Sequence, residues 1–383
     1  MSEMEIPLSA PDIVEADIEA VTAVLRTSRL SLGPRLAEFE AAVARYVGVP
    51  HAVAVSSGTA ALHLSLLALN LQPGDEVIVP SFTFIAVANA VRYVGAQPVF
   101  ADIDADTMNL APASVEAAIT PRTRALIVVH TFGRPADPAL LAIAGRHKLH
   151  VIEDASEAIG AELGERRVGT FGDTGIFAFY PNKQITTGEG GVVVTRDPQL
   201  AGRITALRNQ GRYPAMPRTE PSSGPACPSA WFDHAELGYN YRIGEMECAL
   251  GLSQLARMDA ILARRDAVAR RYCELLRDTP GLILPATDIP GQRLSWFVFA
   301  VRLAESFAPD ARDRLMHTLA AAGIATGRYF APIHLQPAYA AWRRSAQLPV
   351  TESVALRTLA LPFFNRISSA QVDRVAAVLR HYL

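Results

Sequence analysis

Apolar residues recur along this chain with a helical period in some stretches and as short continuous runs in others. From 12 to 47, a helical period on either side of Leu32-Gly33-Pro34 predicts two helices joined by a turn. Beyond them, short apolar runs predict strands, and the periodic stretches between the runs predict helices. The predicted strands span 52–55, 77–79, 99–100, 125–129, 150–154, 175–179 and 192–195, and the predicted helices span 60–69, 83–94, 113–118, 138–146 and 198–208.

Strands that alternate with helices are typical of a mostly parallel sheet covered by helices on both faces, the α/β class. The alternation stops at a proline-rich stretch, 212–231, which we interpret as a loop. After it, 244–276 is predicted as one long connecting helix, 293–303 as a strand, and 310–322 and 369–381 as helices. We therefore predict a large domain over 1–250 and a smaller C-terminal α/β domain over 251–383.

Composition excludes several classes of protein. With 383 residues, 50% of them hydrophobic, and a formal net charge of −2, the chain is globular and has no basic surface for nucleic acid or anionic membranes. Cys227, Cys248 and Cys273 are odd in number and lack metal-ligand spacing, so we expect free thiols, a reducing compartment and no metal site. Without a signal-like start or a membrane-length apolar run, we expect a cytoplasmic protein.

Lysine usage singles out one position for chemistry. Lys148 and Lys183 are the only lysines among 36 basic residues, so arginine supplies almost every structural positive charge. Arginine stays protonated, whereas burial can lower the pKa of a lysine until its amine acts as a nucleophile or forms a Schiff base. Lys148 lies in the polar run Arg146-His147-Lys148, which we interpret as surface. Lys183 follows an apolar strand and precedes a glycine-rich turn, and we interpret it as a reactive amine.

Two further groups fall at the carboxyl ends of predicted strands, where ligands bind in such sheets. Asp154 ends the strand 150–154, and Ser57-Gly58-Thr59 form a tight turn between a strand and a helix. Free backbone N–H groups at the start of a helix suit a phosphate, although both features could be simple caps. Together with Lys183, they provide the amine, the carboxylate and the anion cradle that pyridoxal 5′-phosphate (PLP) requires.

An ordered set of motifs extends over nearly the whole chain. They are Ser57-Gly58-Thr59-Ala60-Ala61-Leu62, Pro73-Gly74-Asp75-Glu76-Val77, Pro80-Ser81-Phe82-Thr83-Phe84, Glu153-Asp154-Ala155, Gly169-Thr170-Phe171-Gly172-Asp173, Pro181-Asn182-Lys183 with Thr186-Thr187-Gly188-Glu189-Gly190-Gly191, and Leu237-Gly238-Tyr239-Asn240-Tyr241-Arg242. In this order they resemble the DegT-type nucleotide-sugar aminotransferases, which are PLP-dependent enzymes of fold type I.

The resemblance implies roles for five residues. Lys183 would hold PLP as a Schiff base and then move the proton during amino transfer, while Asp154 would pair with the pyridinium nitrogen. Phe84 is similar to the aromatic residue that stacks on the ring, and core packing is its alternative role. Gly58 and Thr59 would present backbone N–H groups to the phosphate.

Three other positions bear on the cofactor. Asn240 is similar to an asparagine that reaches the phosphate from the partner subunit, which implies a homodimer with shared active sites. Where many relatives have a serine that bonds the phosphate, this chain has Ala178, so that bond is absent or another donor replaces it. Where many have a glutamine near the cofactor's phenolic oxygen, this chain has Glu157, which needs a proton or a compensating cation there.

The resemblance further implies amino transfer from glutamate to the keto group of a nucleotide-linked sugar. The chain looks most like relatives that aminate C4 of 4-keto-6-deoxy sugars for polysaccharides. A 3-keto sugar or a cyclitol ketone stays open as the acceptor, and a non-catalytic PLP-binding regulator is the less favoured alternative. Our candidates for the substrate pocket are Arg212, Tyr213, Tyr329, Phe330 and His334, with ordinary surface or core roles equally open for each.

Overall fold

A seven-stranded sheet lies at the centre of the computed structural model, which describes residues 5–213, 234–342 and 347–383. Its strand order is β1-β9-β8-β5-β4-β2-β3. The strands are β1 (His51–Val55), β2 (Glu76–Pro80), β3 (Gln97–Ala101), β4 (Thr123–Val129), β5 (His150–Asp154), β8 (Thr174–Ala178) and β9 (Gly191–Thr195). β9 is antiparallel to both neighbours, and all other neighbouring strands are parallel. The predicted α/β class is thus confirmed.

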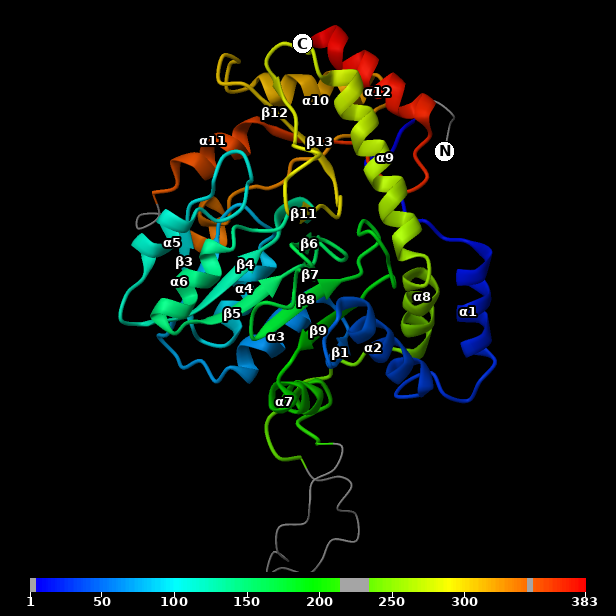
Figure 1. Cartoon of the computed structure of the whole chain (residues 1–383), viewed down its shortest axis with the longest axis vertical. Helices are drawn as coiled ribbons and strands as arrows, with labels where there is room; N and C mark the ends of the chain where they lie inside the picture. The colour runs from blue at the N-terminus through cyan, green and yellow to red at the C-terminus, as the bar shows by residue number, and fades with distance from the viewer. Residues whose placement is uncertain (1–4, 214–233, 343–346) are drawn as a thin grey trace, which may run out of the picture.

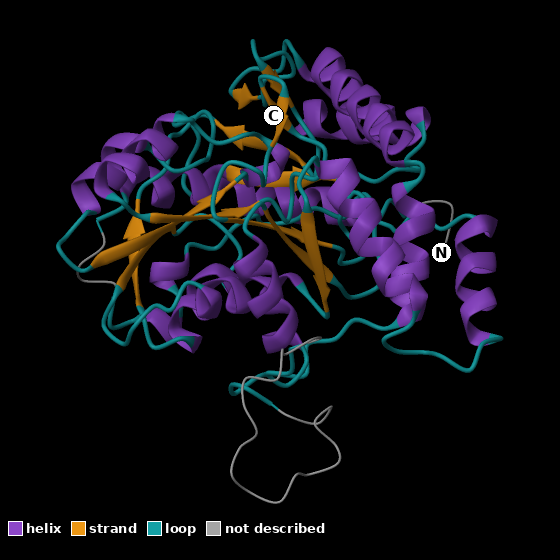
Figure 2. Ribbon diagram, turned by 60° about the horizontal axis from the view of Figure 1, so that its bottom comes forward, coloured by secondary structure: helices purple, strands orange, loops and turns teal. Residues whose placement is uncertain are grey.

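Helices cover both faces of this sheet (Figures 1 and 2). One face carries α3 (Gly58–Ala68), α4 (Ala86–Tyr93) and α7 (Pro198–Arg208). The other carries α2 (Pro34–Val47) and α8 (Glu245–Leu255) over β1 and β9, and α5 (Pro112–Ala118) and α6 (Ala139–His147) over β2 and β4. Because the sheet is covered on both faces, its strands are apolar at successive positions rather than at alternate ones, which explains their continuous apolar runs.

The C-terminal part of the chain forms a second core around a small antiparallel sheet. Its strands, in the order β10-β12-β13, are β10 (Leu282–Ile283), β12 (Phe299–Leu303) and β13 (Thr358–Leu361). Its helices are α9 (Met258–Leu276), α10 (Ala311–Ala321), α11 (Pro349–Arg357) and α12 (Ser369–Tyr382). Ile6, near the start of the described chain, is buried in the same core, so the N-terminal segment packs on the C-terminal part of the chain. The domain boundary after residue 250 stays a prediction.

The predicted single helix over 244–276 is wrong, because the structure has two helices, α8 and α9, that meet at Arg257. Arg257 leaves helical geometry, with φ −112° and ψ 17°. Its guanidinium lies 2.7 Å from a carboxylate oxygen of Asp12 and 2.9 Å from one of Asp17. These buried carboxylates tie the junction to α1 (Glu15–Leu25) and the segment before it.

The predicted strand over 293–303 is also interrupted. Only β12 and the short β11 (Gln292–Arg293) are strands, and β11 pairs instead with the hairpin of β6 (Glu162–Leu163) and β7 (Arg166–Arg167). Ser295, between the two, donates its backbone N–H to the Gly133 carbonyl at 2.9 Å. Its own carbonyl accepts from Gln184 Nε2 at 2.9 Å, so this segment is fastened to the large sheet's loops.

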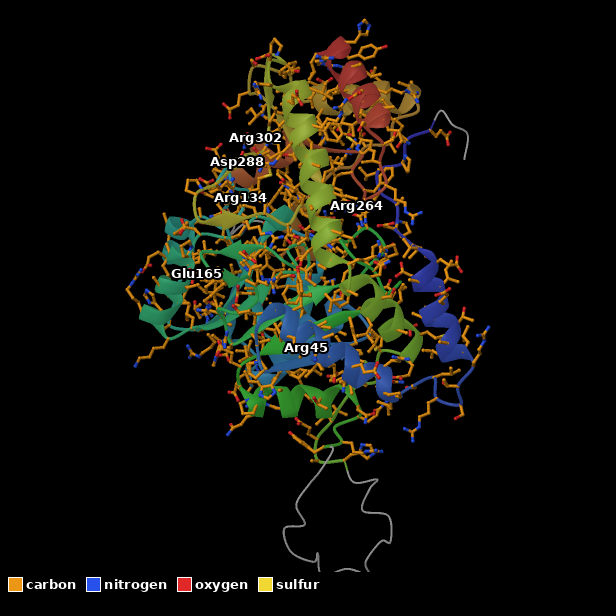
Figure 3. All side chains as sticks on the ribbon, turned by 45° about the vertical axis from the view of Figure 1, so that its right-hand side comes forward. Arg45, Arg134, Glu165, Arg264, Asp288 and Arg302 are labelled. Carbon is orange, nitrogen blue, oxygen red and sulfur yellow. The ribbon has the colours of Figure 1, made fainter. Side chains whose placement is uncertain are left out.

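Charged side chains such as Arg45, Arg264 and Asp288 lie on the outside of the molecule (Figure 3). Among the described helices, none is long and apolar enough to cross a membrane. Cys248 and Cys273 are free thiols, whereas Cys227 and most of the predicted loop 212–231 lie outside the described residues. In those described parts of the chain, no three His, Cys, Asp or Glu side chains cluster as a metal site would require.

Candidate active site

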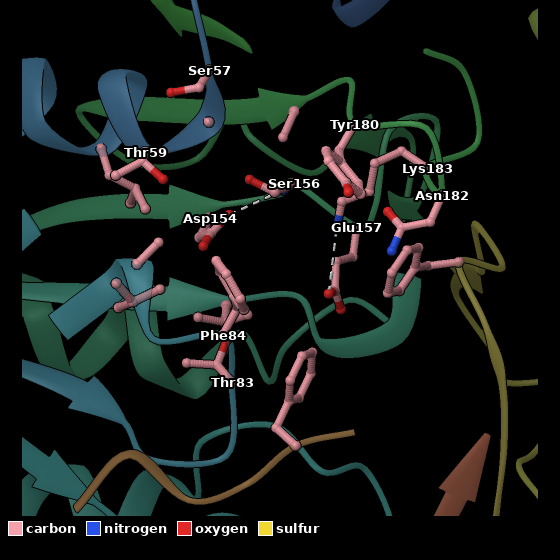
Figure 4. A pocket seen from close by; sticks show the side chains of 18 of the residues that line it. Ser57, Thr59, Thr83, Phe84, Asp154, Ser156, Glu157, Tyr180, Asn182 and Lys183 are labelled. Atoms are coloured by element: carbon pink, nitrogen blue, oxygen red, sulfur yellow. Dashed lines mark hydrogen bonds and ion pairs between the residues drawn. The ribbon is translucent and has the colours of Figure 1, made fainter. Parts of the chain in front are cut away.

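A cavity of about 560 Å³ lies at the carboxyl ends of the central parallel strands (Figure 4). β4 contributes Val129, β5 ends at Asp154, β8 ends at Ala178, and α3 points its first turn at the same space. The full lining is Ser57, Gly58, Thr59, Leu62, Thr83, Phe84, Ala86, Val87, Val129, Asp154, Ser156, Glu157, Ala178, Tyr180, Asn182, Lys183, Glu189, Gly190, Phe297, Tyr329 and Phe330. Most of the residues predicted from the sequence therefore share one cavity.

Lys183 enters this cavity from the loop between β8 and β9. Its backbone N–H donates to the Tyr180 carbonyl at 2.9 Å, which closes a turn and directs the side chain inward. Its Nζ lies 3.5 Å from Glu157 Oε1 and 3.9 Å from the centroid of the Phe297 ring. With 13% of the side chain exposed, the amine is held against a carboxylate and an aromatic face and still borders the cavity.

Asp154 is the last residue of β5 and is buried, with 7% of its surface exposed. Its Oδ1 accepts the backbone N–H of Ser156 at 3.1 Å, which turns the chain sharply beyond the strand end. The β5 backbone is fixed as well, since the Asp154 carbonyl accepts the N–H of His130 at 3.1 Å. A carboxylate held in this way at the cavity wall suits a protonated ring nitrogen.

Glu157 is the second buried carboxyl group of the cavity. Burial raises its pKa, and nearby Asp154 adds to that effect. Lys183 and the backbone N–H of Phe132, which donates to Oε2 at 3.0 Å, act in the opposite direction without cancelling it. The pKa of Glu157 therefore lies above its ordinary value of 4.5, and Lys183 is a cation at hand for the ionised form.

The first turn of α3 forms the anion-binding side of the cavity. Ser57 caps the helix, because its Oγ accepts the Ala60 N–H at 3.1 Å. Within the described parts of the chain, the N–H groups of Gly58 and Thr59 have no protein acceptor. A Cβ on Gly58 would lie 2.8 Å from the Ala178 Cβ, so glycine allows the turn to approach β8 closely. Two free N–H groups at a helix start fit a phosphate.

Aromatic side chains complete the walls. Phe84 lines the cavity with 62% of its surface exposed, so one face of its ring is free to stack. Phe297, Tyr329 and Phe330 come from the C-terminal part of the chain. Their rings contact one another, with centroids 6.0 Å apart for Phe297 and Tyr329 and 5.2 Å apart for Tyr329 and Phe330.

Four predicted site residues lie outside the cavity lining. Asn240 is exposed and pairs through its backbone with Asn209. Tyr213 donates its hydroxyl to Glu236 Oε1 at 2.9 Å, and Arg212 adjoins it. His334 is buried, with its Nδ1 2.7 Å from Ser81 Oγ and its Nε2 3.2 Å from Glu352 Oε1. The assigned contacts of these four residues with cofactor or substrate stay predictions.

Our sequence reasoning missed several lining residues. Asn182 and Glu189 belong to the same motif as Lys183, and Tyr180 directly precedes that motif, so their closeness to Lys183 in the sequence could have identified them. Ser156 lies two positions after Asp154, so its place in the sequence could have identified it in the same way. Phe297 had no such signal, because it reaches the cavity only through the packing of the C-terminal core on the large sheet.

An inward amine, a buried carboxylate and free N–H groups around one cavity of this size fit PLP. This constellation on a mostly parallel seven-stranded sheet, with its one antiparallel strand β9, defines the class of fold type I PLP enzymes.

The chain belongs to the DegT/DnrJ/EryC1/StrS aminotransferase family, whose model matches residues 11–380. It is 40% identical to GDP-perosamine synthase of Caulobacter vibrioides over 100% of both chains. It is 38% identical to the spore coat polysaccharide biosynthesis protein SpsC of Bacillus subtilis, over 98% of this chain and 96% of that protein.

Solved structures of similar proteins share this fold over nearly the whole chain. S. venezuelae DesV superposes with a TM-score of 0.87 at 40% identity, covering 99% of this chain and 98% of DesV. Spr1654 of Streptococcus pneumoniae, solved in a PLP form, gives a TM-score of 0.89 at 26% identity over 99% of this chain and 98% of that one. The predicted family, fold type, aminotransferase activity and PLP cofactor are confirmed.

Proposed function

We propose that this protein transfers an amino group from glutamate to the keto group of a nucleotide-linked sugar, at C4 of a 4-keto-6-deoxy sugar, for polysaccharide or related glycan biosynthesis. The names of two relatives support this proposal, since one is a GDP-perosamine synthase and the other a spore coat polysaccharide biosynthesis protein. The preference for C4 and for glutamate comes from the motif resemblance. We further propose that the protein works in the cytoplasm.

The observation that carries the proposal is the position of Lys183. Its amine borders the cavity, close to the carboxyl group of Glu157 and the ring of Phe297. An amine placed in this way could take the proton from the amino donor's carbon and deliver it to the cofactor's carbon, which is the task of a general acid and base in amino transfer. A regulator that only binds PLP has no need of this proton transfer, so the geometry favours catalysis.

PLP, when bound, supplies an electron sink for the carbon that loses its proton. Asp154 would keep the ring nitrogen protonated, because a buried carboxylate stabilises a neighbouring positive charge. Gly58 and Thr59 would hold the phosphate through their free N–H groups. Phe84 would stack on one face of the ring.

Glu157 would meet the phenolic oxygen, where burial raises its pKa above 4.5 and Lys183, 3.5 Å away, is a counter-charge for its ionised form. The aromatic wall of Phe297, Tyr329 and Phe330 would exclude water from the amine.

The shortage of positive charge in the cavity lining supports an active site shared between two subunits. Glutamate and a nucleotide diphosphate bring several negative charges, yet among the described lining residues Lys183 is the one cation. Further cations must come from outside this lining, and Arg212 and a second subunit are the candidate sources. Asn240 is exposed and lies outside the cavity of its own chain, which agrees with a role in a neighbour's site. We therefore include a homodimer in the proposal.

A substrate panel tests the function. The PLP-loaded enzyme and glutamate are incubated with nucleotide-linked 4-keto and 3-keto sugars and with a cyclitol ketone, and both 2-oxoglutarate and the mass of the amino product are followed. We expect amination of the 4-keto-6-deoxy sugar. Amination of only the 3-keto sugars would overturn the C4 assignment. Amination of only the cyclitol would overturn the nucleotide-sugar assignment, and PLP binding without any turnover would favour the regulator.

A further inference from the structure

Ala178 leaves the wall of the cavity without a hydroxyl group at a defined point. This residue ends β8 and lines the cavity, and its Cβ lies 2.8 Å from the position that a Cβ on Gly58 would take. It therefore faces the first turn of α3. There, among the described residues, the N–H groups of Gly58 and Thr59 have no protein acceptor and could bind an anion. A serine at 178 would direct a hydroxyl at that anion, but alanine has none.

A different hydroxyl group, that of Ser156, reaches the same point from the loop after β5. Ser156 Oγ lies 3.6 Å from the same Cβ position on Gly58, so Ser156 and Ala178 both lie beside Gly58 in the first turn of α3. In Figure 4 the Ser156 side chain extends from the loop after β5 toward the start of α3, between Asp154 and Ser57. Ser156 also lines the cavity.

The backbone of Ser156 is fixed while its hydroxyl is available. Its N–H donates to Asp154 Oδ1 at 3.1 Å, which sets the direction of the side chain. Among the hydrogen bonds of the described residues, none involves the Ser156 hydroxyl, whereas Ser57 Oγ already accepts the Ala60 N–H as a helix cap. A serine hydroxyl can donate one hydrogen bond, and a phosphate oxygen is a strong acceptor.

We propose that the Ser156 hydroxyl donates a hydrogen bond to the PLP phosphate and replaces the donor that Ala178 cannot supply. The proposal rests on the PLP assignment and is independent of the sugar substrate. It makes Ser156 a cofactor-binding residue and not a participant in proton transfer. The loop after β5 then serves both ends of the cofactor, the ring nitrogen through Asp154 and the phosphate through Ser156.

The test compares cofactor binding by the full-length wild type, Ser156→Ala, Ala178→Ser and the double variant, each freed of cofactor. Binding of PLP and of pyridoxal, which lacks the phosphate, is followed by absorbance and fluorescence titration. We expect Ser156→Ala to weaken PLP binding about tenfold or more, as is typical for loss of a hydrogen bond to a charged group. Pyridoxal binding should not change. The double variant should recover most of the loss, because Ala178→Ser supplies a hydroxyl to the same point.

Three results would overturn the proposal. Equal losses for PLP and pyridoxal would show that Ser156 only shapes the Asp154 loop. An unchanged PLP affinity in Ser156→Ala would show that its hydroxyl does not bond the phosphate. Failure of the double variant to recover would show that the two positions do not serve one group. No sugar enters these titrations, so a negative substrate panel would leave their outcome unaffected, and circular dichroism of each cofactor-free variant confirms its folding.

Discussion

Glu153, the neighbour of Asp154 on β5, offers the sharpest test of how the fold holds the cofactor site. Successive strand residues point to opposite faces, so Glu153 points away from the cavity wall that Asp154 forms. Its Oε2 accepts from His130 Nε2 at 3.0 Å and from the Gly169 N–H at 2.8 Å. Its Oε1 accepts from the N–H groups of Phe171 at 2.5 Å and Gly172 at 2.8 Å.

Glu153→Gln keeps the size of the side chain but replaces one carboxylate oxygen with an NH₂ group. In either orientation of the amide, two of the four donors then face another donor instead of an acceptor. Hydrogen bonds to a buried charged group contribute about 1.5–3 kcal/mol each, so we expect the free energy of unfolding to fall by about 3–5 kcal/mol.

Urea unfolding of the cofactor-free proteins, at one protein concentration and followed by tryptophan fluorescence, measures this change. Glu116→Gln is the matched control, because Glu116 is also bonded to a histidine and a second donor but lies on the surface. It should unfold like the wild type. If Glu153→Gln lost less than about 1 kcal/mol, a single neutral hydrogen bond's contribution, the reasoning would be refuted.

The pH dependence gives an independent check. Burial alone would raise the pKa of Glu153, but hydrogen bonds from His130 and from the Gly169 and Gly172 amides outweigh it, and the pKa lies below its ordinary value of 4.5. A lowered carboxyl pKa contributes stability that is fully present above 4.5 and is lost as pH falls through the folded-state value. The difference between wild type and Glu153→Gln should therefore be constant near neutral pH and shrink on acidification.

Three further predictions concern the site itself. Lys183→Ala should abolish amino transfer and the visible absorbance of the PLP-loaded protein, whereas Lys148→Ala, at an exposed position, should keep both; turnover without Lys183 would contradict its role. If Asn240 completes a neighbour's phosphate site, light scattering at assay concentration should find the active species at least dimeric, and an active monomer would exclude the shared site. The pKa of Glu157 is raised in the folded protein, so the ionised form of this side chain destabilises the fold. Glu157→Gln removes that ionisation. Its free energy of unfolding should therefore rise relative to wild type as the pH increases above 4.5, and the difference should disappear at or below 4.5. Urea unfolding of the cofactor-free proteins across this range measures it, and a difference independent of pH would show that ionisation is not the cause.

The order of strands and helices in the large sheet could be predicted because each strand is buried on both faces and reads as an apolar run. β2 and β9, each with all five residues buried, are the clearest cases. The break between α8 and α9 could not be predicted, since no glycine or proline marks it. Arg257, at the break, donates hydrogen bonds to the carboxylates of Asp12 and Asp17, which lie more than two hundred residues earlier in the chain. Only the folded chain brings these charges together.

The candidate site likewise contains some residues that the sequence could predict and others that it could not. Asp154 ends β5 and Lys183 follows β8, and the parallel pairing of these two strands brings their carboxyl ends to the same edge of the sheet. Phe297 and Tyr329 reach the cavity from the C-terminal core, and their approach depends on how two separate cores pack, for which the sequence carries no periodic signal. His334, one of our candidates for the substrate pocket, is buried with its Nδ1 2.7 Å from Ser81 Oγ, and its assignment to that pocket stays a prediction.

The one antiparallel strand of the large sheet explains why the lysine and the phosphate cradle converge. β9 pairs with β1 and with β8, and Gly191 stands opposite both Val55 and Ala178. The chain must therefore leave β8, turn back past Lys183 and re-enter the sheet beside the start of α3. A Cβ on Gly191 would lie 2.5 Å from the Ser57 carbonyl oxygen, so only glycine lets β9 fit against that turn. The same Cβ would lie 2.8 Å from the Gly58 backbone nitrogen, so the second glycine of the Gly190-Gly191 pair lets the strand that follows the Lys183 loop pack directly against the phosphate site.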